Sequence, residues 1–208
     1  MKTGFMGGTF SPPHMGHLNA AKGFIREMNL DRLIIIPAGV SPFKVNSMAT
    51  ASNHDRMEMA KLCFLPLDSD KCRVEVSDME VSKEGTSYTI DTINELKSMY
   101  PDDELYMYVG SDMFFSLEKW KAAEDIFAKC IIFTKCREKN QLEAMLLTKQ
   151  KFEKLYNAEV YISIDEEFVV SSTQVREVLA LQNFETCRNL LTDKVLGYII
   201  KGGLYFEA

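Results

Sequence analysis

Short runs of β-branched and aromatic residues recur along the chain, and longer stretches with a helical repeat of apolar positions separate them. Short apolar runs bounded by glycine, proline and polar residues are typical of buried strands. On this pattern we predict strands at residues 2–7, 32–37, 72–76, 104–110, 130–134 and 159–164.

The segments between these runs carry apolar residues at steps of three and four, which favours helices with one buried face. The repeat is clearest at residues 15–28, 90–100 and 142–156, and a single polar residue, Lys149, interrupts the last of them. From Ser171 onward the tail also shows apolar helical faces. We therefore expect strands and helices to alternate along the chain, with a helical tail.

Alternating β and α elements indicate a doubly wound α/β fold, in which helices cover both faces of a parallel, Rossmann-like sheet. The length of 208 residues suits one domain. We assign residues 1–208 to a single domain, with residues 171–208 as a small helical C-terminal subdomain. In such sheets ligands bind beyond the carboxyl ends of the strands, where the strand order reverses.

The composition, 46% hydrophobic and 26% charged, is ordinary for a globular protein. No apolar run is long enough for a membrane span, and the apolar stretch after Met1 is too short for a signal peptide. We expect the mature protein to start at Met1 and to stay in the cytoplasm. The five cysteines include no C-x-x-C pair, which favours reduced thiols over a zinc site.

The net charge of −6 argues against a nucleic-acid-binding protein, because such proteins normally carry a basic patch. A small phosphate ligand stays compatible with this charge, since a few local cations decide its binding. We therefore expect no nucleic-acid partner and no membrane partner.

A glycine pair and two histidines lie between the first strand and the first helix. Gly7 and Gly8 permit a tight turn, and the helix start beyond them offers N–H groups to an anion. His14 and His17 fall on one helical face, with Gly16 leaving the space between them clear. The pair can present two imidazole donors to one phosphate. A zinc pair and two surface histidines are the alternatives, and no carboxylate or cysteine at a fitting spacing supports zinc.

The usual phosphate-binding fingerprints are absent from the chain. Neither G-x-G-x-x-G nor G-x-x-x-x-G-K-[ST] occurs. The chain is therefore neither a P-loop NTPase nor a dehydrogenase of the standard fingerprint.

A second polar motif begins the helical tail at Ser171, Ser172 and Thr173, followed by Arg176. Serine and threonine cap helices, and we place Arg176 in the first turn. A cation there is unfavourable for the helix dipole, so an anion at this helix start would explain it. A capped helix with a solvated arginine is the alternative.

These two motifs resemble those of a known family. Residues 7–17 look like the G-G-T-F-D-P-x-H-x-G-H signature of the nucleotidylyltransferase superfamily, and residues 171–176 resemble its S-S-T-x-I-R motif. Ser11 replaces the usual aspartate, and we expect it to take over a local turn or cap role.

The middle and end of the chain resemble the bacterial nicotinate-nucleotide adenylyltransferases within that superfamily. The similar segments are residues 84–92, residues 110–112 with Trp120, and residues 195–199 and 203–205, so the resemblance spans nearly the full length. The chain departs from the family pattern at Phe43 and at residues 134–137. Arg56 has no assignment yet: a helix-surface role and an anion contact both stay open.

The resemblance implies a set of site residues. Catalytic roles fall to His14, His17, Lys44 and Arg176. ATP binding falls to Gly7, Gly8, Thr9, Phe10, His14, His17, Gly110, Asp112, Ser172, Thr173 and Arg176. Nicotinate mononucleotide binding falls to Gly39, Lys44, Ser87, Tyr88, Thr89 and Trp120. No protein ligand for a metal is expected; Mg²⁺ would arrive with ATP, and a homodimer is compatible with the family.

The chemistry of these residues fits the roles, with a plainer alternative for each. Trp120 can stack on a pyridine ring, or be a core residue. Ser87 and Thr89 can hold a carboxylate at a helix start, or only cap the helix. Asp112 can accept ribose hydroxyls, or be an N-cap. Lys44, in the polar loop of residues 38–53, can reach a phosphate, or be solvated.

The expected reaction is transfer of AMP from ATP to nicotinate mononucleotide by direct in-line attack, with pyrophosphate released in NAD biosynthesis. The rivals are another adenylyl- or cytidylyltransferase of the superfamily, such as one that acts on pantetheine phosphate, and a nucleotide sensor that has lost catalysis.

Overall fold

The computed structural model describes residues 1–39, 51–136, 139–164, 168 and 170–206. At its centre is a six-stranded sheet with the order β3-β2-β1-β4-β5-β6, and every neighbouring pair of strands is parallel. The strands are β1 (Lys2–Gly8), β2 (Arg32–Pro37), β3 (Arg73–Val76), β4 (Glu104–Val109), β5 (Ile131–Lys135) and β6 (Val160–Ser163). The predicted doubly wound parallel sheet is confirmed, and each strand lies where the sequence pattern placed it.

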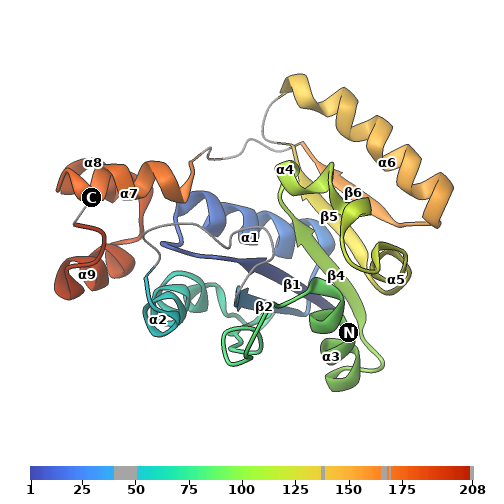
Figure 1. Cartoon of the computed structure of the whole chain (residues 1–208), viewed down its shortest axis with the longest axis horizontal. Coiled ribbons are helices and arrows are strands. Elements are labelled where there is room, and N and C mark those ends of the chain that lie inside the picture. The colour runs from blue at the N-terminus through green and yellow to red at the C-terminus, as the bar shows by residue number, and fades with distance from the viewer. Residues whose placement is uncertain (40–50, 137–138, 165–167, 169, 207–208) are drawn as a thin grey trace.

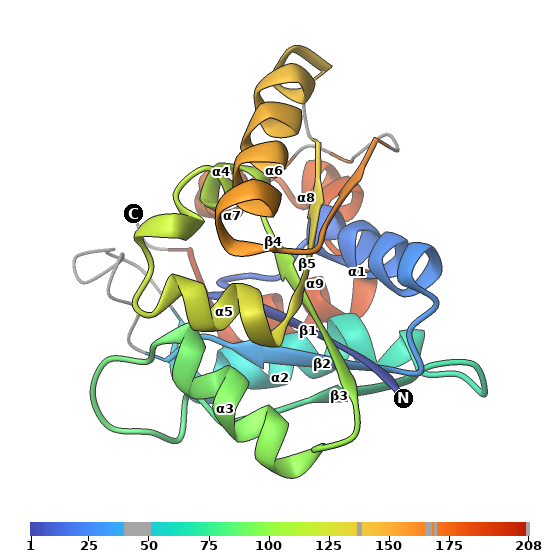
Figure 2. The same cartoon turned by 90° about the vertical axis from the view of Figure 1, so that its right-hand side faces the viewer.

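Helices cover both faces of the sheet (Figure 2). One face carries α1 (Met15–Met28), α2 (Asn53–Phe64), α7 (Ser172–Ala180), α8 (Phe184–Leu190) and α9 (Asp193–Gly202). The other carries α3 (Thr89–Met99), α4 (Ser111–Phe114), α5 (Ala123–Lys129) and α6 (Leu142–Tyr156). Short 3₁₀ turns lie at Leu65–Leu67, Leu117–Lys119 and Lys139–Gln141. None of the helices described is both long and apolar enough to cross a membrane.

Strand side chains point alternately into two separate cores. On β1, Phe5 packs under α3 and its neighbours, whereas Met6 packs under α1 and α2. On β2, Ile34 and Ile35 divide in the same way. Because both faces are buried, the strands read as continuous apolar runs instead of alternating with polar residues.

The C-terminal helices α7, α8 and α9 gather beside α1 and α2 at one end of the molecule (Figure 1). Val175, Leu179, Cys187 and Val195 from this segment are fully buried in the same core as α1 and α2. The helical tail is therefore packed on the sheet domain and shares its core.

The strand order reverses between β1 and β4, which lie side by side at the centre of the sheet. Loops that leave the carboxyl ends of these two strands diverge to opposite faces, which opens a crevice between them. The turn after Gly8 and the turn at Gly110 border this crevice. Ligands of such folds bind in this crevice.

Candidate active site

The turn after β1 brings backbone close to the crevice. A side chain on Gly8 would approach the ring of Phe10 to 2.8 Å, so this position has no room for one. A side chain on Gly7 would meet nothing within 4 Å. Phe10 itself is buried and adopts a positive φ of 47°, in the left-handed region that non-glycine residues rarely occupy. The turn therefore leaves open space over Gly7 and is held in an unusual backbone shape.

His14 and His17 cap the first helix for each other. The backbone N–H of His17 donates to Nδ1 of His14, and the N–H of His14 donates to Nδ1 of His17, both at 3.3 Å. Their rings stack with centroids 3.7 Å apart. A nitrogen that accepts a backbone N–H carries no proton, so in the neutral rings the proton sits on Nε2. The cap thus makes each imidazole an Nε2–H donor.

Three side chains from distant segments hold the backbone of this turn. On α2, Arg56 donates from Nη1 to the carbonyl of Thr9 at 2.9 Å. On α7, Arg176 donates to the carbonyl of Ser11 at 2.8 Å, and Ser172 donates to that of Pro12 at 3.0 Å. The two polar motifs, far apart in sequence, are therefore in direct contact.

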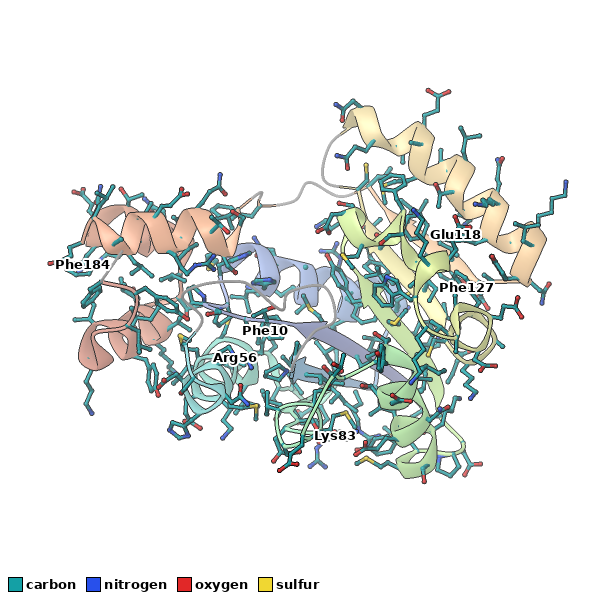
Figure 3. All side chains as sticks on the ribbon, viewed as in Figure 1. Phe10, Arg56, Lys83, Glu118, Phe127 and Phe184 are labelled. Carbon is teal, nitrogen blue, oxygen red and sulfur yellow. The ribbon has the colours of Figure 1, made fainter. Side chains whose placement is uncertain are left out.

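The helix-surface role left open for Arg56 is wrong, whereas an anion contact stays a prediction. Its side chain, labelled in Figure 3, is buried, and it bonds the carbonyl of Thr9 and the side chain of Asn53. Burial lowers the pKa of its guanidinium. An arginine stays charged at neutral pH even so, and it is a structural cation beneath the turn.

The start of α7 differs in detail from the prediction. Ser171 is the N-cap and forms a capping box with Gln174. Arg176 is thus the fifth residue of the helix, just beyond the first turn, and the prediction of its place was wrong by about one residue. Its guanidinium reaches back to donate to the carbonyl of Ser11, and the anion expected near this helix start stays a prediction.

A cavity of about 610 Å³ opens beside the glycine turn. The turn residues Gly7, Gly8 and Thr9 line it together with Ser87, Tyr88, Thr89 and Trp120. Strand residues such as Phe5, Ile36 and Met107 also line it. The lining is thus mostly apolar with a few polar groups, as in many small-molecule sites.

The start of α3 lines the cavity. Its N-cap is Tyr88, and no described side chain caps the helix, so a capping role for Ser87 or Thr89 is not observed. The hydroxyl of Ser87 is buried and has no hydrogen-bond partner among the described residues. Orphaned N–H groups at a helix start, beside an unpartnered hydroxyl, suit an anionic ligand group.

Two charged side chains that line the cavity, Glu80 and Lys121, were not predicted from the sequence. Lys121 lies over the ring of Tyr88 at 4.1 Å from its centroid and pairs with Asp91 at 3.5 Å. Glu80 also lines the cavity and accepts a hydrogen bond from Thr92 at 2.7 Å. Lys121 directly follows Trp120, so the sequence could have indicated that it lies near the site. The place of Glu80 at the cavity is evident only from the fold.

The remaining predicted residues are distributed around the cavity. Gly39 packs so closely that a side chain there would come within 2.7 Å of the Ser87 hydroxyl. Asp112 is exposed in the first turn of α4, whose N-cap is Gly110, so the N-cap alternative for Asp112 is wrong. Lys44 lies outside the described residues. The ligand roles of all these residues remain predictions.

Metal binding and thiol reactivity in the described part of the chain depend on which side chains converge and on the environment of each thiol. No three His, Cys, Asp or Glu side chains converge there as a metal site. All five cysteines are free and buried. Burial raises the pKa of Cys63 and of Cys130 to about 12, so neither thiol is a reactive thiolate.

Comparison with known proteins gives a consistent picture. The family model of cytidylyltransferase-like proteins matches residues 5–178. A probable nicotinate-nucleotide adenylyltransferase of Lachnoclostridium phytofermentans is 34% identical over 204 residues, covering 98% of both chains. Another, of Caldicellulosiruptor saccharolyticus, is 35% identical and covers 100% of both chains.

A solved structure shows the same fold. The nicotinic acid mononucleotide adenylyltransferase of Plasmodium falciparum, complexed with APC, superposes with a TM-score of 0.75. The alignment covers 98% of this chain and 96% of that one, at 18% sequence identity. At that identity the likeness supports the architecture alone.

Proposed function

The chain belongs to the cytidylyltransferase-like family, and on that premise we propose that it is a nicotinate-nucleotide adenylyltransferase. It transfers AMP from ATP to the phosphate of nicotinate mononucleotide. The products are nicotinate adenine dinucleotide, a precursor of NAD, and pyrophosphate.

The observation that carries this proposal is the position of the cavity. The turn of Gly7, Gly8 and Thr9 lines it, and so does the start of α3 with Trp120. The first suits a phosphate, because backbone and a helix start approach it closely. The second suits an anionic aromatic ring, because Trp120 offers a flat face and α3 offers N–H groups. A pyridine mononucleotide carries these two groups at its two ends.

The reaction needs no protein nucleophile. An oxygen of the mononucleotide phosphate bonds to the α-phosphorus of ATP, while the bond from that phosphorus to the bridging oxygen breaks and pyrophosphate leaves. Catalysis is then positioning and stabilisation of charge on the phosphate oxygens. His14 and His17 supply Nε2–H donors for this charge, and Lys44 and Arg176 hold the outer phosphates.

Arg176 keeps donors for that task. Its Nη1 and Nη2 groups donate to Ser11 and Thr173, whereas a guanidinium has five N–H groups in all. The contact with Ser11 therefore orients the guanidinium beside the turn without using all its donors.

Mg²⁺ enters as part of the ATP substrate. Enzymes of this kind generally use a divalent metal with ATP, and Mg²⁺ retains several waters and binds substrate phosphates in preference to an all-protein cage.

Pyrophosphate release tests the proposal. The protein is mixed with MgATP and, separately, nicotinate mononucleotide, nicotinamide mononucleotide and phosphopantetheine, and with MgCTP in a parallel series. We expect release with ATP and nicotinate mononucleotide, and much less with the amide. Release only with phosphopantetheine or CTP would make it another family member, and binding of ATP without any release would make it a sensor.

A further inference from the structure

The end of the chain returns to the glycine–histidine turn. Beyond α9, the hydroxyl of Tyr205 lies 2.9 Å from the hydroxyl of Ser11, across 194 residues of sequence. Ser11 is 1% exposed, and its hydroxyl also accepts the backbone N–H of Ala51 at 3.1 Å. The side chain of Ser11 is thus held by the C-terminal segment and by Ala51, two residues before α2.

The C-terminal segment takes an unfavourable backbone shape to make this contact. Gly203, which ends α9, has a φ of 63°, which glycine adopts freely. Tyr205 has a φ of 64°, in the left-handed region that costs a large L-residue conformational energy. Phe206 packs on Phe184 of α8, with ring centroids 5.8 Å apart, and anchors the segment on the far side. The tail is therefore built to direct the Tyr205 hydroxyl at Ser11.

The same turn is held by its backbone. The carbonyl of Ser11 accepts from Arg176, and the carbonyl of Pro12 accepts from Ser172. Only Pro13 then separates this point from His14, the cap of α1. Burial raises the pKa of Tyr205, so its hydroxyl stays neutral and keeps its proton for the hydrogen bond. Small displacements of Ser11 must therefore pass to the histidine pair.

We propose that Tyr205 is a positioning residue for the nucleotidyl transfer: by bonding Ser11 it sets the place of His14 and His17 relative to the reacting phosphates. The inference rests on the proposed function, because it takes the two histidines as the groups that stabilise the reaction. Tyr205 itself touches no reacting atom.

The test is Tyr205→Phe, which keeps the ring and removes the hydroxyl. We expect kcat to fall about tenfold or more, because small misplacement of catalytic groups is costly, while KM for both substrates changes less than about twofold. The matched control is Tyr198→Phe on α9, which loses a hydrogen bond of 2.8 Å to Asp55, a residue of α2 and not of the turn. That variant should keep its kcat.

Nitrogen NMR of the imidazoles gives a second readout that needs no activity. The chain has only three histidines, and the third, His54, adjoins Asp55. Tyr205→Phe should shift the ring signals of His14 and His17 and leave those of His54 in place. Tyr198→Phe should do the reverse. Unchanged signals of His14 and His17 in Tyr205→Phe would overturn the proposal.

Ser11→Ala removes the same hydrogen bond from the other partner, and it replaces Tyr205→Phe if that variant does not fold. If Tyr205 acts through Ser11, the double variant loses no more kcat than the larger single effect. Additive losses of kcat in the double variant would reduce Tyr205 to a structural role. So would equal losses of melting temperature in Tyr205→Phe and Tyr198→Phe with kcat intact in both. Failure of the proposed function is seen separately, as a wild-type protein that releases no pyrophosphate.

Discussion

The histidine pair shows how one local contact fixes the chemistry of a side chain. Each ring accepts the other's backbone N–H at Nδ1, so the proton on Nε2 follows from the helix cap. Histidine is an uncommon N-cap, because serine, threonine, aspartate and asparagine are preferred there. The same two residues therefore cap the helix and orient two hydrogen-bond donors.

His17→Ala should lower turnover far more than it weakens ATP binding. Removing a donor to developing charge typically costs about a hundredfold or more in kcat. Steady-state kinetics and equilibrium titration with ATP check this, and His54→Ala, which changes an exposed histidine on α2, is the control. A near-normal kcat in His17→Ala would contradict the assigned role.

Ser87→Ala should raise KM for the mononucleotide several-fold and leave KM for ATP unchanged. The Ser87 hydroxyl is buried without a partner among the described residues, so a bound ligand group is its natural partner. A single hydrogen bond of this kind is worth about 1 kcal/mol. Kinetics with one substrate saturating separates the two KM values, and Ser82→Ala, at an exposed position, is the control. A change in KM for ATP would instead assign Ser87 to the ATP-binding part of the site.

At the scale of elements, α3 contacts the segment that leads into α5 beside the cavity. Lys121 joins them, because its ammonium group lies over Tyr88 and pairs with Asp91 in the first turn of α3. The pair itself is exposed, so its effect on stability is small. Because Lys121 lines the cavity, it also adds a positive charge near a bound pyridine ring.

Lys121→Gln should narrow the preference for nicotinate over nicotinamide mononucleotide by several-fold. Both rings offer Trp120 the same face, so the preference must come from charge and from the N–H groups of α3. The measurement is the ratio of kcat/KM for the two mononucleotides at fixed ATP. Lys154→Gln, on the exposed side of α6, should leave the ratio unchanged. An unchanged ratio in Lys121→Gln would assign the discrimination to α3 alone.

At the scale of the whole molecule, the sheet divides two apolar cores that bury the cysteines. Burial raises the pKa of Cys72 to about 11, and of Cys63 and Cys130 to about 12. These thiols are neutral in the folded protein over the pH range in which an unfolded chain would ionise them. We therefore expect these buried thiols to react slowly with thiol reagents near neutral pH, and the fold to lose stability at alkaline pH.

The free energy of unfolding should fall as pH rises from about 9, the ordinary thiol pKa, towards about 12. A raised folded-state pKa contributes stability below the unfolded value, and that contribution is lost as pH rises through the folded value. Urea unfolding at stepped pH measures it. At pH 8 the native protein should release almost no thiol signal with a disulfide reagent, and all five after unfolding. Rapid labelling of the native protein would contradict the buried arrangement.

The sequence by itself determined the elements of the fold. The apolar run Ile34–Ile36 predicts a buried strand, and the apolar repeat of residues 15–28 predicts a helix. Both patterns are local, because they depend only on the spacing of apolar residues along a short segment. The glycine–histidine motif was equally readable, since its turn and cap involve residues within a few positions of one another.

Only the tertiary structure decided what these motifs contact. Arg56 gave no local signal of its role, because its partner, Thr9, lies in another element. Glu80 enters the cavity, and Tyr205 reaches Ser11, only because the parallel sheet and the C-terminal helices bring distant segments to one edge. Such contacts depend on packing across many residues of chain, and no pattern within one segment encodes them.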